Sequence, residues 1–188
     1  DELWVKELAH RVHALPWYAS NVANRVGWPY YKTGSHTIFG NLFFKKHSLN
    51  DIYYDKIDHQ LNLDLINTFN HICKDQKLNL DLVTIDGNLQ FMGMDGTAHT
   101  DGPPNHTVFI LMLCAFDVPK NIGGEFVHCP SKKVIPFKSG RLITMNAADL
   151  HYAKAFNKPN IARFSIKWVG SARSVSYTHL TLPTRTRV

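Results

Sequence analysis

The chain has 188 residues, which suits one domain with a sizeable core, and its 44% apolar and 19% charged residues are ordinary for a globular protein. The net charge is +6, but residues 171–188 carry three of these positive charges and no acid, which leaves +3 on the rest. That charge is too small to indicate a nucleic-acid or anionic-membrane partner, and no apolar run reaches the roughly 18 residues that a membrane span needs.

Three cysteines, Cys73, Cys114 and Cys129, are scattered without the spacing of a metal site. An odd count favours reduced thiols and a cytoplasmic location. The chain begins at Asp1, inside a helical pattern and without a signal peptide. We therefore expect that the N-terminus is truncated, and the question of whether a leader segment preceded it stays open.

Two amphipathic helices are predicted before residue 80. Apolar residues recur every three or four positions over 2–15 and again over 62–74. Residues 17–31 are rich in Trp and Tyr, which either pack at the edge of a core or form the wall of a substrate cleft. A strand is predicted over 36–44, and residues 45–59 are polar and predict a surface excursion.

From residue 80 the pattern changes to that of short strands. Apolar runs at 80–85 and 89–94 flank the turn-like Asp86-Gly87-Asn88 and predict a hairpin. Residues 171–188 have no such pattern, and we expect a non-native or disordered tail there. About seven short strands behind two helices indicate a mainly β (α+β) sandwich or barrel with helices against one sheet. The remaining strands are predicted over 106–116, 125–129, 132–137, 141–146 and 161–169.

The segment His99-Thr100-Asp101 is a candidate metal site. In an extended segment, residues i and i+2 face the same side, about 6–7 Å apart along the strand. One His and one carboxylate on a shared face, joined by a distant His, form the facial triad that holds iron(II) with open coordination positions. The residues alone leave the third ligand open among His106, His128 and His151.

The last predicted strand carries its polar residues on one face. Alternation puts Arg163, Ser165 and Lys167 on that face and large apolar residues on the other. The polar face either meets water or lines an interior. In an interior, the Arg163 guanidinium needs an anion, because a lone buried charge is costly, and a dicarboxylate ligand would supply one.

An ordered set of motifs runs from about residue 84 to residue 170. Its members are His99-x-Asp101, Thr107, Gly123-Gly124-Glu125, Pro136, Gly140-Arg141-Leu142, His151, Arg163-Phe164-Ser165-Ile166 and Trp168. This order resembles the iron(II)- and 2-oxoglutarate-dependent oxygenases, in particular their prolyl-4-hydroxylase-like branch. The ordered combination is far more specific than any one of its motifs.

The resemblance implies a double-stranded β-helix (jelly-roll, cupin-like) as the catalytic core over residues 80–170. Residues 1–79 would form an N-terminal, substrate-side extension of the same domain. His99, Asp101 and His151 match the iron ligands of that family.

Arg163 matches the basic residue that pairs the distal carboxylate of 2-oxoglutarate, and Ser165 matches an assisting position. Together with the three metal ligands, Arg163 completes the set of candidate catalytic residues. Two departures stand out. Arg163 follows His151 by 12 residues, a slightly long gap, and the tyrosine positions usual on the core strands are apolar here.

The activity implied by the resemblance uses Fe(II), 2-oxoglutarate and O2, with ascorbate in support, and releases succinate and CO2. The substrate would be a small molecule or a peptide, for instance a peptidyl proline, that becomes hydroxylated. Two alternatives stay open: a cupin-like metal enzyme that does not use 2-oxoglutarate, and a non-catalytic jelly-roll binding or structural module. Because a ligand His binds metal only when neutral, activity should fall as the pH drops through roughly 6.5.

Overall fold

The computed structural model describes residues 2–21, 38–48, 51–54 and 58–173. Within these ranges the helices are α1 (Glu2–His13) and α3 (His59–Asp75). The strands are β1 (Tyr18–Asn21), β2 (Ile38–Ser48), β3 (Asp51–Tyr54), β4 (Leu80–Gln90), β5 (His106–Leu113), β6 (Phe126–His128), β7 (Lys133–Ile135), β8 (Leu142–Asn146), β9 (His151–Ala153) and β10 (Arg163–Ala172).

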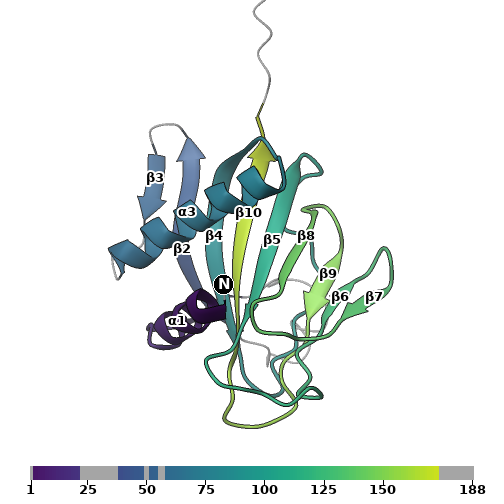
Figure 1. The fold of residues 1–188 in the computed structure, drawn as a ribbon. Coiled ribbons are helices and arrows are strands. Elements are labelled where there is room, and N and C mark those ends of the chain that lie inside the picture. The colour runs from purple at the N-terminus through teal and green to yellow at the C-terminus, as the bar shows by residue number, and fades with distance from the viewer. Residues whose placement is uncertain (1, 22–37, 49–50, 55–57, 174–188) are drawn as a thin grey trace, which may run out of the picture.

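The strands form two antiparallel sheets (Figure 1). The larger sheet has the order β1-β2-β4-β10-β5-β8, with β3 paired to β2, and the smaller has the order β7-β6-β9. The prediction of a mainly β jelly-roll core with N-terminal helices against one sheet is confirmed. The boundary between residues 79 and 80 stays a prediction, and β1 and β2 extend the same sheet that contains β4.

Strand β5 shows how the layers are held together, because both of its faces are apolar. Phe109 and its alternating neighbours pack in the cluster that contains α1 and α3, which lie across one face of the larger sheet (Figure 1). Val108, Ile110 and Met112 point the other way and pack against Phe126 of the smaller sheet. Each fully buried side chain of this size contributes about 1.5–3 kcal/mol to the free energy of unfolding.

Strand β10 lies at the centre of the larger sheet and divides the apolar core from a polar interior. Phe164, Ile166 and Trp168 face the helices, and the Trp168 indole Nε1 donates to the Leu65 carbonyl of α3 at 2.9 Å. Arg163, on the opposite face, is 1% exposed. The polar face of this strand therefore lines an interior cavity.

The predicted hairpin at Asp86-Gly87-Asn88 is wrong, because these residues continue the single long strand β4. Gly87 is needed there for close packing: a Cβ at this position would lie 2.9 Å from the Phe43 ring. Asp86 is needed for its charge, since its carboxylate pairs with Lys167 of β10 at 3.4 Å. The turn-like residues thus serve packing and charge pairing within a strand.

Two further differences concern short strands and the tail. Segments outside the predicted strands contain β1, β3 and β9, each only three or four residues long. Strand β10 continues through Ser171 and Ala172, two residues into the predicted tail. Trp28, Tyr30, Tyr31 and residues 174–188 lie outside the described residues. Neither described helix is long and apolar enough to cross a membrane.

Candidate metal centre and the cavity behind it

Backbone pairing brings the two distant parts of the candidate metal site together. His99 and His151 form an antiparallel bridge in which each amide donates to the other residue's carbonyl at 3.0 Å. The Asp101 amide donates to the Ala147 carbonyl at 2.8 Å, which ties this segment to the turn between β8 and β9. Residues paired in this way carry their side chains on one face, so the imidazoles project together.

The side chains of His99, Asp101 and His151 converge on one point. Their candidate ligand atoms all lie within 4.8 Å of one another. The Asp101 carboxylate stands 3.7 Å from His99 Nε2 through Oδ1 and 3.2 Å from His151 Nε2 through Oδ2. Among the described residues this is the one group of three His, Cys, Asp or Glu side chains that could hold a metal ion.

Each imidazole is oriented by a backbone carbonyl behind it. His99 Nδ1 lies 2.8 Å from the Thr97 carbonyl, and His151 Nδ1 lies 2.8 Å from the Asp149 carbonyl. Because a carbonyl oxygen can only accept, Nδ1 carries the proton in the neutral ring and Nε2 presents its lone pair to the cluster. Burial lowers the pKa of His99 below its ordinary value, although the Thr97 hydrogen bond acts to raise it. The lowered pKa favours the neutral form of the ring.

The third side chain, Asp101, is held as an anion. Lys167 Nζ donates to Asp101 Oδ1 at 2.6 Å, while Oδ2 is buried and accepts no hydrogen bond from the described residues. Burial acts to raise the pKa of Asp101, but the ion pair with Lys167 acts against burial, and the pKa stays well below its usual range. The free Oδ2 of a buried carboxylate calls for a cation or a donor.

At the far end of the cavity lies Arg163, a cation without an acidic partner among the described residues. Its Nε donates to the Gly124 carbonyl at 3.2 Å and its Nη1 to Gln90 Oε1 at 2.8 Å, while Nη2 is buried without a partner. Burial lowers the pKa of Arg163 to about 10. The unpaired Nη2 is therefore a built donor site for an anion.

The Gly123-Gly124 motif explains how the backbone reaches this arginine. Both glycines have positive φ, 87° and 77°, a conformation that L side chains rarely adopt. A Cβ on Gly124 would lie 2.6 Å from the Phe156 ring and 3.4 Å from Arg163 Cδ. Only glycine lets the 124 carbonyl approach the guanidinium so closely.

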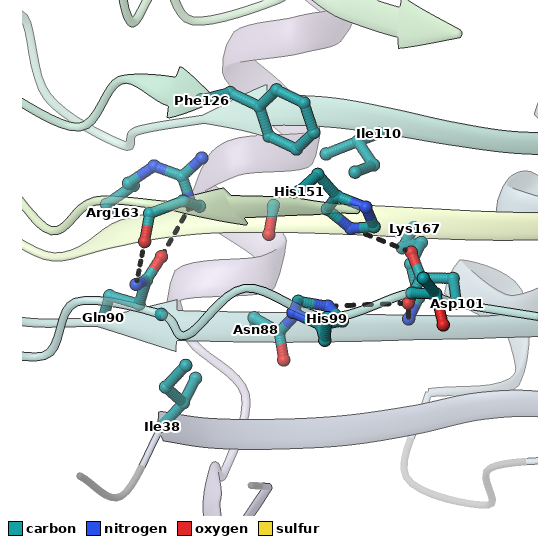
Figure 2. Close-up of a pocket in the computed structure, with 14 residues that line it drawn as sticks. Ile38, Asn88, Gln90, His99, Asp101, Ile110, Phe126, His151, Arg163 and Lys167 are labelled. Carbon is teal, nitrogen blue, oxygen red and sulfur yellow. Dashed lines mark hydrogen bonds and ion pairs between the residues drawn. The ribbon is translucent and has the colours of Figure 1, made fainter. Parts of the chain in front are cut away.

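One cavity of about 240 Å³ joins the two ends. Figure 2 shows His99, Asp101, His151 and Lys167 gathered at one end, with Arg163 and Gln90 at the other. Apolar walls come from both sheets, namely from Ile38, Ile110 and Phe126. Nine of the fourteen lining residues are polar or charged, which suits a small polar ligand.

The structure places one of the three candidate third ligands beside His99 and Asp101. His151 joins the cluster and is 2% exposed, whereas His128 pairs instead with Asp149 at 3.1 Å. His106 lies beside Gly102 and outside the cluster. Ser165, a predicted site residue, is buried and lines the cavity with Arg163.

Two polar residues of β4, Asp86 and Gln90, were missed as site residues in the sequence. Cross-strand pairing puts Arg163 opposite Gln90, Ser165 opposite Asn88, and Lys167 opposite Asp86. The signal was present, because positions 86, 88 and 90 alternate in the same way as positions 163, 165 and 167. It was obscured by Gly87, which made the segment look like a turn.

Comparisons with known proteins agree with this geometry at the level of fold. No protein-family model and no curated protein matches the chain. Several solved structures, in contrast, are similar to the chain in fold. An oxidoreductase of the 2OG-Fe(II) oxygenase family from Burkholderia pseudomallei has a TM-score of 0.63 at 16% identity, over 90% of this chain and 78% of that one.

Prolyl hydroxylases are among the similar structures. A prolyl-4-hydroxylase from Pseudomonas putida has a TM-score of 0.62 at 13% identity, over 93% of this chain and 89% of that one. A prolyl hydroxylase from Trichoplax adhaerens, solved with a peptide fragment of the hypoxia inducible factor oxygen degradation domain, has a TM-score of 0.60 at 10% identity, over 89% and 78%. At these identities the likeness establishes the fold, which is that of the 2OG-Fe(II) oxygenases.

The residues at both ends of the cavity fit the groups that this fold implies. Two neutral imidazoles and one carboxylate are the donor set that holds iron(II) and leaves positions open. The buried Asp101 Oδ2 and the buried Arg163 Nη2 both lack a hydrogen-bond partner, and a cation and an anion would satisfy them in turn.

Proposed function

We propose that this protein is an iron(II)- and 2-oxoglutarate-dependent dioxygenase that hydroxylates a peptide or small-molecule substrate. One observation carries the proposal: a His-Asp-His cluster and a buried arginine without an acidic partner share a single cavity. A metal enzyme that does not use 2-oxoglutarate has no evident need for a buried, unpaired Arg163.

At the metal end, His99, Asp101 and His151 would hold Fe(II). Bound there together with 2-oxoglutarate and O2, the iron supplies oxidative decarboxylation of the cosubstrate and hydroxylation of the substrate. The role of the chain is to fix the three ligands on one side and to leave the opposite side open. The Thr97 and Asp149 carbonyls hold both imidazoles in the tautomer that this needs.

At the other end, Arg163 and Ser165 would bind the distal carboxylate of 2-oxoglutarate. The guanidinium is held by Gln90 and the Gly124 carbonyl, so its position is set before the ligand arrives. Free N–H groups of Nη1 and Nη2 then face a carboxylate in the bidentate arrangement that arginine favours. Burial strengthens this contact, because few water molecules compete for it.

The prime substrate is proposed by class only. The Trichoplax prolyl hydroxylase is a structure of the same fold with a peptide bound, which supports a peptide substrate for this chain. The segments 28–31, 45–58 and 102–105 are candidates for contacting it. Trp17 is described and packs inward against Phe164, so it supports the core.

The test is an anaerobic titration of the Fe(II)-loaded protein with 2-oxoglutarate, followed by visible absorption. A saturable metal-to-ligand band is expected for the wild type. Asp101→Ala should lose the band because iron is no longer held, and Arg163→Ala should need far more 2-oxoglutarate to reach it. Formation of succinate under air, with ascorbate present, then reports turnover.

The same titration separates the alternatives. A metal enzyme that does not use 2-oxoglutarate would bind Fe(II) without producing the band. A non-catalytic module would bind neither, and either result would overturn the proposed function.

A further inference from the structure

Lys167 connects the candidate metal site to the β-sheet beneath it. Its ammonium lies 2.6 Å from Asp101 Oδ1 and 3.4 Å from Asp86 Oδ1. Lys167 of β10 and Asp86 of β4 are direct cross-strand partners, so their side chains share a face of the larger sheet. The three side chains form a chain of charges that runs from the sheet to the metal ligand.

This contact makes the two oxygens of Asp101 different. Oδ1 is engaged by the ammonium, whereas Oδ2 is buried, accepts no hydrogen bond and lies 3.2 Å from His151 Nε2. The Asp101 amide is fixed separately by the Ala147 carbonyl. Because the Asp101 backbone and Oδ1 are both held, only Oδ2 is available to bind a metal ion.

We propose that Lys167 is a positioning residue that holds Asp101 as a one-oxygen metal ligand, and that Asp86 anchors Lys167. The inference rests on the proposed function, because it requires that the cluster binds a divalent metal. Asp86 has a second effect. Its negative charge offsets that of the Lys167 ammonium, so the Asp86–Lys167 pair adds no net positive charge beside the metal.

Asp86 and Lys167 support each other as ions. Burial acts to lower the pKa of Lys167, but the charges of Asp86 and Asp101 outweigh burial and raise it above its ordinary value. Burial raises the pKa of Asp86, and Lys167 counteracts that rise. Both groups face the same side as His99 and His151, and partners of this kind commonly tune ligand basicity and orientation.

A purely electrostatic role for Lys167 predicts the opposite sign. A cation beside the site repels a divalent metal, so removing it would tighten metal binding. A positioning role predicts weaker binding, because the freed carboxylate rotates and must be ordered again when metal binds. When the charges of Lys167 and Asp86 are removed together, a purely electrostatic role predicts little change, so weaker metal binding separates the two roles.

The experiment measures Co(II) binding to the metal-free full-length chain by calorimetry, together with the visible spectrum of bound Co(II). The test variant is Lys167→Met combined with Asp86→Asn, which keeps the net charge unchanged. We expect the Kd for Co(II) to rise about 10–100-fold, the usual effect of removing a partner of a metal ligand. The Co(II) spectrum should change as well, because Asp101 can then bind through both oxygens.

Two controls make the result decisive. Arg11→Met breaks the ion pair of Arg11 with Asp64 (2.6 Å), which lies outside the metal site, and should leave the Co(II) Kd unchanged. If the test variant does not fold, Lys167→Gln with Asp86→Asn keeps polar side chains in the same space. We expect that variant to raise the Kd at least severalfold.

The outcomes distinguish failure of this inference from failure of the proposed function. A wild-type chain that binds no Co(II) overturns the proposed function. Wild-type binding with an unchanged or tighter Kd in the folded variant overturns the role of Lys167 and leaves the proposed function standing. A higher Kd with an unchanged spectrum would mean that Lys167 does not set how Asp101 binds, and would likewise overturn the inference.

Discussion

The two ends of the cavity are built on opposite electrostatic principles. At the metal end, Asp101 pairs with Lys167, which also pairs with Asp86, so the carboxylate has a cationic partner within the chain. At the other end, Arg163 is fully buried and its partners, Gln90 and the Gly124 carbonyl, are neutral. The first end can be ordered without a ligand, whereas the second end carries a charge that only an added anion compensates.

This difference explains why the arginine end identifies the ligand class more sharply. Buried polar clusters with compensated charges occur in many folds for structural reasons alone. A buried guanidinium with an unpaired Nη2 costs free energy of folding, and a bound carboxylate would recover it. The comparison therefore predicts that changes at the two ends have separable effects.

The largest expected effect is on cosubstrate binding in Arg163→Met. Losing one member of a buried charge pair should weaken 2-oxoglutarate binding by about 4 kcal/mol, close to 1000-fold in Kd. The Co(II) Kd should stay near the wild-type value, because Arg163 touches none of the metal ligands. Calorimetric titration with each ligand measures both constants, and a parallel loss of metal affinity would show that the two ends are not independent.

The next effect is on stability in Gly124→Ala. The new methyl group meets the Phe156 ring at 2.6 Å and the backbone keeps a φ of +77°, so the free energy of unfolding should fall by about 3 kcal/mol. Gly93→Ala is the matched control, because its φ is +86° but nothing lies within 4 Å. Urea unfolding should show a loss of only about 1 kcal/mol there, and equal losses in both variants would remove the packing argument.

A smaller effect is expected from Gln90→Leu. Gln90 holds Nη1 of Arg163, and its amide also donates to the Met94 carbonyl at 2.7 Å. Without it the guanidinium is less well fixed, and the Kd for 2-oxoglutarate should rise about tenfold, as for the loss of one hydrogen bond to a charged group. Metal affinity serves as the internal control, and an unchanged 2-oxoglutarate Kd would mean that Gly124 alone positions Arg163.

The mildest effect concerns pH at the metal end. Burial lowers the pKa of His99, so in the folded, metal-free chain the midpoint of its protonation lies below the ordinary value of about 6.5. Protonation removes the Nε2 lone pair, so metal affinity falls as the pH falls, by at most about tenfold per pH unit for this group. NMR titration of the His99 ring measures the midpoint, and a midpoint above 6.5 would contradict the structure.

The sequence predicted the elements that have a strong local pattern or a motif. His99-x-Asp101 and the alternation of β10 are visible in one dimension, and the structure places both at the cavity. The choice of His151 over His106 and His128 came from the resemblance, because single histidines carry no periodicity. The structural reason for it is the backbone bridge between His99 and His151.

What the sequence did not predict depends on pairing between distant strands. Asp86 and Gln90 become site residues only because β4 lies beside β10, and their alternation alone does not reveal which strand is the neighbour. Gly87 made the error larger, since the same residue type serves tight turns and close packing of strands. The strands β6 and β9 are three residues long and gain their order from partners rather than from propensity.

The most direct test of the two-ended cavity is a crystal structure of the wild-type chain with Mn(II) and 2-oxoglutarate, prepared without oxygen. The account predicts metal density between His99, Asp101 and His151, and a single 2-oxoglutarate that reaches from the metal to the Arg163 guanidinium. Metal at the cluster with the cosubstrate absent or bound away from Arg163, despite saturating 2-oxoglutarate, would contradict it.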